Sequence, residues 1–209
     1  MPQPGLSDID ICSLALRFIG SKPIQSFSDQ TPQAGLMNAL YPLARDIVTR
    51  SYRWKFSIKR VQLNRLSLVP YQFKQTRIEL PTGLYVYALP SDYLSMIETD
   101  QDPSPYKMES IISNATTGAQ QLVIISDQSL LGIRYVSRVT DSTLFDPHFV
   151  SALTAYLAKE VVLPETGDLK KWEMMEKLYA AKIAEARFLG SIEDSNDTLV
   201  ATYFTTETR

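Results

Sequence analysis

Apolar residues recur at helical spacing in two segments of the first quarter of the chain. The first segment begins at Ser7, which can cap a helix, and ends at Gly20. The second begins at 31–32, where a threonine N-cap precedes a proline in the first turn, and runs to about Tyr52. Because Pro42 lies inside this second segment, we expect a kink or a break there.

The same signals predict two helices in the last third of the chain. Asp146 precedes a proline and can cap a helix whose apolar stripe extends to Pro164. Asp168 can cap the next helix, which we expect to end at Gly190. Since two helices joined by so short a turn must pack side by side, they are predicted to form an antiparallel hairpin.

Between these helical segments the spacing of apolar residues changes from helical to alternating. The alternation begins at Trp54, and a change of phase predicts a β-bulge near Arg60. Residues 91–97 are predicted to be a turn or a short helix. Four further strands are predicted at 84–89, 106–112, 122–126 and 133–139.

Together these elements predict an α+β fold, in which a small antiparallel β-sheet is inserted into a four-helix bundle. The predicted helical domain comprises 1–53 and 140–190, and the inserted β-rich domain comprises 54–139. Residues 191–209 are predicted to be an extended, flexible C-terminal arm.

Composition restricts the chemistry available to the protein. A chain of 209 residues with 44% hydrophobic and 21% charged residues is typical of a globular protein. A single cysteine, Cys12, excludes an internal disulfide framework and a multi-cysteine zinc site, and its position favours a core residue. A single histidine, His148, excludes sites that need two. No apolar run is long enough to span a bilayer, and the start of the chain lacks a signal-peptide pattern.

Candidate catalytic or metal-binding groups are few. Asp146 lies near His148, so an enzyme built on this pair would need a water-excluding pocket at the start of that helix. A helix N-cap and a structural histidine explain the pair better. Acidic clusters at 100–102 and 193–197 could bind a divalent cation, but neither has the spacing of a calcium loop. We therefore predict no catalytic residue, no metal ligand and no cofactor.

Charge is distributed unevenly along the chain. Residues 1–80 hold 11 basic against 5 acidic residues, and residues 81–209 hold 10 against 18. Such asymmetry is typical of a macromolecular contact or of head-to-tail packing between copies, although solvated faces can also segregate by chance. The basic stretch 45–65 contains seven positive charges with aromatic residues between them, which outlines a nucleic-acid surface. Alternation, however, places Trp54 opposite Lys55, which favours aromatics in the core and cations in solvent.

Several segments, in this order, resemble one known family. They are SDIDICSLALRFIG, SYRWKF, YVYALPSDYL and FDPHFVSALTAYLAKEV, and they span most of residues 7–190. This ordered combination resembles the head-to-tail adaptor proteins of short-tailed bacteriophages, often called tail tubular protein A or gatekeeper.

The resemblance implies a non-enzymatic virion protein without a cofactor, assembled in the host cytoplasm. A twelvefold ring of such adaptors joins the portal protein to the tail nozzle around the DNA channel, with no sequence-specific binding of DNA and no membrane. Residues 191–209 would then be a portal-binding arm that orders on its partner. Its hydrophobic anchors would be Leu199, Val200, Tyr203 and Phe204. The candidates for contacts between subunits or with the tail are Arg53, Lys55, Lys59 and Arg60, and the alternative is that these residues bind nucleic acid.

Overall fold

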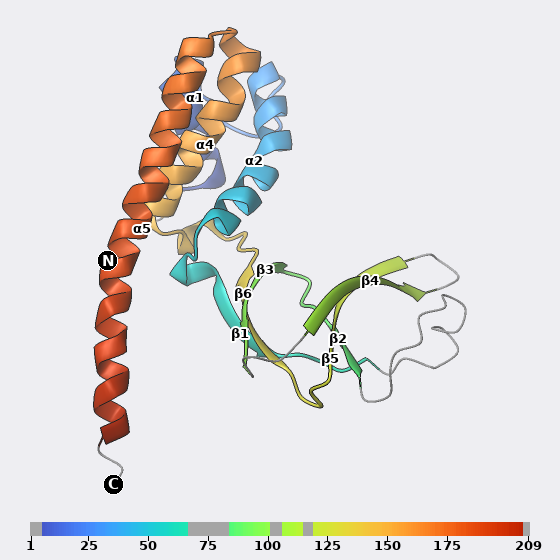
Figure 1. The fold of residues 1–209 in the computed structure, drawn as a ribbon. Coiled ribbons are helices and arrows are strands. Elements are labelled where there is room, and N and C mark those ends of the chain that lie inside the picture. Colours follow the sequence, from blue (N-terminus) through green and yellow to red (C-terminus); the bar gives the residue numbers. More distant parts are fainter. Residues whose placement is uncertain (1–5, 67–83, 101–105, 115–118, 207–209) are drawn as a thin grey trace. The chain divides into compact units, whose positions relative to one another are not determined.

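The computed structural model describes residues 6–66, 84–100, 106–114 and 119–206, with the backbone alone for 112–114, 119 and 193–206. The chain divides into two compact units. The helical unit comprises Met1–Phe56 and Val139–Arg209, and the β unit comprises Ser57–Arg138. Four α-helices lie in the described part of the first unit and six antiparallel strands in that of the second, which confirms the predicted α+β class (Figure 1).

The two N-terminal helices begin where their caps predict. Helix α1 (Asp8–Ile19) has a capping box in which Ser7 and Asp10 bond each other's backbone N–H groups. Helix α2 (Pro32–Ser51) begins after Thr31, whose hydroxyl accepts a hydrogen bond from a backbone N–H at 3.2 Å. This helix continues through Pro42, so the chain does not break there. The reason is that the buried face of α2 has core residues on both sides of the proline, and their packing outweighs one missing hydrogen bond.

The two C-terminal helices form the predicted hairpin but are longer than predicted. Helix α4 (Pro147–Thr166) includes Pro164 in its last turn and ends at Gly167, which has a left-handed φ of 64°. Helix α5 (Leu169–Thr206) does not end at Gly190, contrary to our expectation. Gly20 and Gly167 adopt positive φ, the conformation that ends a helix, whereas Gly190 keeps a helical backbone. Residues 191–206 are therefore helical rather than extended.

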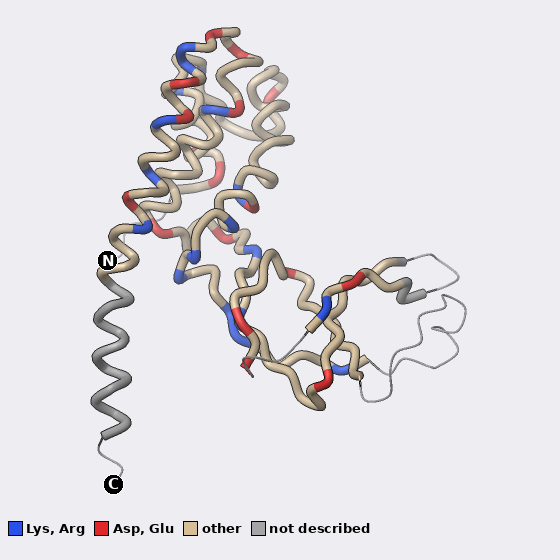
Figure 2. Tube along the Cα trace, viewed as in Figure 1, with Lys and Arg blue, Asp and Glu red and all other residues tan. Residues whose placement is uncertain are grey.

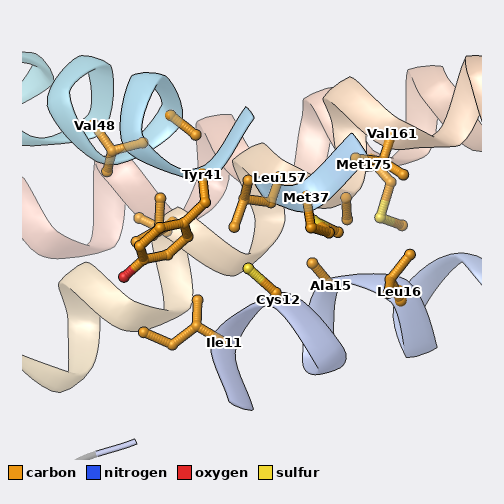
Figure 3. Packing of buried hydrophobic residues seen from close by; sticks show 14 of the residues in the cluster. Ile11, Cys12, Ala15, Leu16, Met37, Tyr41, Val48, Leu157, Val161 and Met175 are labelled. Carbon is orange, nitrogen blue, oxygen red and sulfur yellow. The ribbon is translucent and has the colours of Figure 1, made fainter. Parts of the chain in front are cut away.

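Helix α4 is the centre of the helical unit, because it packs against α1, α2 and α5. Its alanine, leucine and valine residues are buried on several faces, and they form one apolar cluster with the inner faces of the other helices. Cys12 is fully buried in this cluster, as Figure 3 shows. Burial, together with the nearby Asp8 carboxylate, raises the pKa of the Cys12 thiol to about 12. The thiol is thus a core group, as predicted.

The β unit contains two three-stranded sheets rather than one. In each sheet the central strand is antiparallel to both neighbours. One sheet has the order β1 (Ile58–Gln62), β6 (Gly132–Ser137), β3 (Tyr93–Thr99), and the other has the order β2 (Tyr85–Ala88), β5 (Ala119–Ser126), β4 (Tyr106–Asn114).

Three details of the β-rich segment differ from the prediction. Residues 93–99 form strand β3 and not a turn or helix, because they pair with β6. The pairing of β1 with β6 is unbroken at Arg60, so the predicted bulge is absent and the irregular register lies in β3 instead. The segment after Trp54 forms a 3-10 helix, η1 (Lys55–Ser57), before the strand begins. In the first two cases the backbone follows its pairing partners rather than the local alternation.

Candidate functional site

The basic stretch 45–65 is divided between the two units and does not form one platform. Arg45 is only 9% exposed in α2, and its guanidinium pairs with the Asp46 carboxylate at 3.1 Å. Arg53 and Lys55 are exposed in the helical unit, whereas Lys59 and Arg60 are exposed in the β unit. Figure 2 shows basic and acidic residues interspersed along the helices.

The aromatic residues of this stretch face the core, as the alternation predicts. Trp54 is buried, and its indole N–H donates to the Val48 carbonyl oxygen at 2.9 Å. The Trp54 and Phe56 rings contact the Phe149 ring edge to face, with centroids 5.2 and 5.0 Å away. Lys55 is exposed, whereas Trp54 is buried and Phe56 half-buried, so these rings leave little open face on which a base could stack.

In the β unit, Lys59 forms an ion pair with Asp92. Its ammonium group lies 2.6 Å from the Asp92 carboxylate, which also accepts a hydrogen bond from the Tyr135 hydroxyl at 2.9 Å. Burial alone would raise the pKa of Asp92, but the hydrogen bonds from Lys59 and Tyr135 outweigh it and lower that pKa. Arg60 lies opposite Arg134 in the sheet, and Arg134 pairs with Glu98 at 3.1 Å.

A cavity of about 270 Å³ lies at the start of α4, where an enzyme built on Asp146 and His148 would need one. Asp146 is exposed, and its carboxylate accepts a hydrogen bond from the backbone N–H of His148 at 2.7 Å, which caps the helix. Since Asp146 and Lys55 line the cavity and both are exposed, the cavity does not exclude water. His148 also lines the cavity, so both members of the pair reach it, and the other lining residues are mostly apolar: Tyr52, Trp54, Phe56, Leu144, Ala186, Leu189 and Gly190.

A second cavity, of about 530 Å³, lies in the β unit beside Arg60 and Arg134. The guanidinium Nε of Arg134 is buried and has no hydrogen-bond partner among the described residues. The cavity carries both signs of charge, because Glu98 and Asp100 line it together with the two arginines.

The predicted acidic clusters do not form a metal site in the described part of the chain. No group of three or more histidine, cysteine, aspartate or glutamate side chains there could hold a metal ion. Asp102 lies outside the described residues, as do the side chains of Glu193, Asp194 and Asp197.

The portal-contact candidates lie on the C-terminal part of α5. Leu199, Val200, Tyr203 and Phe204 belong to this helix by their backbone, and their side chains lie outside the described residues. In the earlier part of α5, whose side chains are described, four large apolar side chains are exposed: Leu169 (59%), Met174 (62%), Phe188 (66%) and Ile192 (49%). Sequence reasoning missed this outer surface, although the seven-residue spacing of Met174, Ala181 and Phe188 was available as a signal.

The described residues thus offer contact surfaces: the exposed cations, an open cavity beside α4, and the outer face of α5. None of the helices in the described ranges is long and apolar enough to cross a membrane. No protein-family model matches this sequence, and no curated protein matches it, so its function has to be proposed from its residues and their geometry.

Proposed function

We propose that this chain is a ring-forming adaptor of a short-tailed bacteriophage, in which it joins the portal protein to the tail nozzle around the DNA channel. In this proposal the four helices act as a bundle that carries the β unit as an insert. The protein works by binding its neighbours and not by catalysis, and its place is the virion. The support is the ordered resemblance of residues 7–190 together with the geometry of α5.

The length of α5 is the observation that carries the proposal. Helix α5 has 38 residues and α4 has 20, and only two residues separate the antiparallel pair. The last 18 residues of α5 therefore run past the start of α4, which at 1.5 Å per residue is roughly 27 Å of helix. A helix that continues so far beyond its own core and carries apolar residues is typical of an arm that packs on another protein. Leu199, Val200, Tyr203 and Phe204 all lie on this projecting part.

The exposed cations fit the same proposal better than they fit nucleic-acid binding. A closed ring needs two different faces on each copy, and the positive first part of the chain complements the negative remainder. Arg53, Lys55 and Arg60 remain candidates for these contacts. The nucleic-acid alternative has less support, because Arg45 and Lys59 already pair with acidic residues and the aromatic rings face the core.

The test is assembly with a portal. The full chain and a variant lacking 191–209 are mixed with the portal protein of the same phage, and the complexes are measured by light scattering and imaged by electron microscopy. We expect a ring of the full chain on the portal and none with the truncated variant. The double substitution Arg53→Glu and Lys55→Glu is expected to weaken contacts between copies. A full chain that ignores the portal at every concentration would refute the proposal.

A further inference from the structure

Strand β1 has an open edge. It pairs with β6 on one side only, and its last four residues are all exposed. Along an antiparallel strand, the N–H and C=O groups of successive residues point to opposite sides. The N–H of Leu63, just after β1, donates to the carbonyl oxygen of Leu131 at 2.8 Å. The odd-numbered residues of β1 therefore bond β6, and the even-numbered ones, Ile58, Arg60 and Gln62, direct their backbone groups to the open edge.

The chain itself fills the continuation of this edge with a strand. The N–H of Leu66 donates to the carbonyl oxygen of Val86 at 2.8 Å, and the N–H of Ala88 donates to that of Asn64 at 3.2 Å. The alternation places both bonds on the same side as the open groups of β1. Strand β2 ends at Ala88, and the edge groups of 58–62 have no backbone bond to a described residue. A further β-strand is what such groups accept.

Charge indicates what kind of strand fits. Arg60 lies opposite Arg134, which in turn lies opposite Glu98 and pairs with it at 3.1 Å. Arg60 thus stands beside a like charge at the end of this row, with no carboxylate partner among the described residues. Like charges directly opposite each other destabilise a sheet, and opposite charges stabilise it. An acidic residue opposite Arg60 completes the row, and the cavity of about 530 Å³ that Arg60 lines leaves space for it.

The same charge disfavours a second copy of β1 as the added strand. Antiparallel pairing of two copies of β1 over their full length would place two Arg60 side chains directly opposite each other. Lys59 is already paired with Asp92, so Arg60 is the cation that decides the pairing. Charged side chains on an edge strand are a common means of preventing such self-association.

We propose that the open edge of β1 binds an extended acidic segment of a partner protein as an added antiparallel strand, with a carboxylate opposite Arg60. The backbone groups of Ile58, Arg60 and Gln62 supply the hydrogen bonds. On the other face of the sheet Val61 is 38% exposed, and a β-branched residue of the partner segment would cover it. This edge site goes beyond the adaptor function and does not rest on it, because any protein with such a segment would fit.

The test uses a synthetic peptide, TVEVT, blocked at both ends, whose glutamate falls opposite Arg60. The full chain is labelled for NMR, and its amide signals are followed as peptide is added. We expect the amide signals of Arg60 and Gln62 to shift and saturate, with a dissociation constant of about 1 mM or lower. The peptide TVKVT should bind about fivefold more weakly. In Arg60→Glu the order of the two peptides should reverse.

Backbone methylation separates strand addition from simple charge attraction. In the added strand the glutamate N–H points to β1, whereas the N–H groups of both valines point away from it. Methylation of the glutamate nitrogen should therefore abolish binding, and methylation of a valine nitrogen is the matched control that should preserve it. In the protein, Gln62→Pro removes one edge N–H and should weaken binding, because a proline is tolerated where that N–H faces solvent. Circular dichroism checks that this variant and Arg60→Glu remain folded.

The other outcomes overturn the proposal. Shifts that persist with the glutamate-methylated peptide would show charge attraction without an added strand. No shift at about 5 mM peptide would show that the edge takes no strand. A chain that dimerises through β1 without peptide would show that a second copy covers the edge. The adaptor function fails separately: a chain that binds TVEVT but ignores the portal supports the edge site and refutes the adaptor.

Discussion

The hydroxyl group of Tyr52 lies directly against Gly190 in the middle of α5. A Cβ atom at position 190 would come within 1.7 Å of the Tyr52 oxygen and 2.9 Å of its ring carbon Cζ. The Tyr52 ring is itself held by an edge-to-face contact with Trp54, at 5.0 Å between centroids. Gly190 therefore provides space for the side chain of the residue that follows α2, and it does not serve as a helix end.

This relationship predicts that Gly190→Ala destabilises the protein. Alanine favours a helix over glycine by about 1 kcal/mol, but the clash with Tyr52 is an overpacking whose cost is typically about 1–3 kcal/mol. We expect a net loss of about 1 kcal/mol in the free energy of unfolding, measured in urea.

Gly35 is the matched control, because it also lies in a helix and a Cβ atom there would meet nothing within 4 Å. Gly35→Ala is expected to stabilise the protein by up to about 1 kcal/mol. If Gly190→Ala were equally stabilising, Tyr52 would move aside freely and the packing argument would be wrong.

The cap of α4 is predicted to depend on a side-chain oxygen at position 146. Asp146→Ala removes the acceptor for the backbone N–H of His148, and such losses cost about 1 kcal/mol of unfolding free energy. Asp146→Ser keeps an acceptor and should restore most of the stability. Thermal unfolding of the two variants gives the comparison. Similar stability in both would show that the cap contributes little.

The contacts of Asp92 predict a loss of stability in acid. Its pKa is lowered in the folded protein, so this carboxylate stabilises the fold above its ordinary pKa of about 3.9, and the contribution disappears as the pH falls through the folded value. Because Lys59 is half exposed, we expect Asp92→Asn to cost only about 1 kcal/mol at neutral pH and less at pH ~2.

Urea unfolding at the two pH values measures this effect. Asp127→Asn is the control, since Asp127 is exposed in the same unit and bonds the neighbouring side chain of Gln128. A loss for Asp92→Asn that is the same at both pH values would contradict the role of the carboxylate charge.

The Cys12 thiol is predicted to be unreactive in the folded protein. It is fully buried, and with a pKa of about 12 only about one thiol in ten thousand would be ionised at pH 8. Ellman's reagent should label it at the rate at which the helical unit opens, and rapidly in denaturant. Fast labelling of the native protein would contradict the packing of α1 against α4.

The helix starts could be predicted because their causes are local. Ser7, Thr31, Asp146 and Asp168 each accept a hydrogen bond from a backbone N–H two or three residues away. Such a bond depends only on the residue type and its position next to an apolar run. The ends of α1 and α4, at Gly20 and Gly167, depend on the local backbone in the same way. For α4 the prediction placed the end at Pro164, because a proline was expected to stop the helix.

The candidate site could be predicted only in part. The separation of the buried Trp54 from the exposed Lys55 was predicted correctly, but its basis in an extended strand was wrong, because 55–57 form a 3-10 helix and Ser57 is buried. Arg45 could not be recognised as a buried partner of Asp46, since helical spacing alone does not show which face of α2 meets α4. The exposed apolar residues Met174, Phe188 and Ile192 of α5 were missed as one surface, because the predicted helix end at Gly190 separated Ile192 from the other two.

By itself the sequence determined the α+β class, the four helix starts and five of the six strands, since these depend on residue spacing and on bonds within a few residues. Tertiary structure decided whether Gly190 ends a helix, because the answer depends on Tyr52, 138 positions earlier. It also decided that 93–99 is a strand and that Arg60 is not a bulge, since both follow from pairing with β6. Packing and pairing between distant segments have no local signature, and where they oppose a weak local preference they outweigh it.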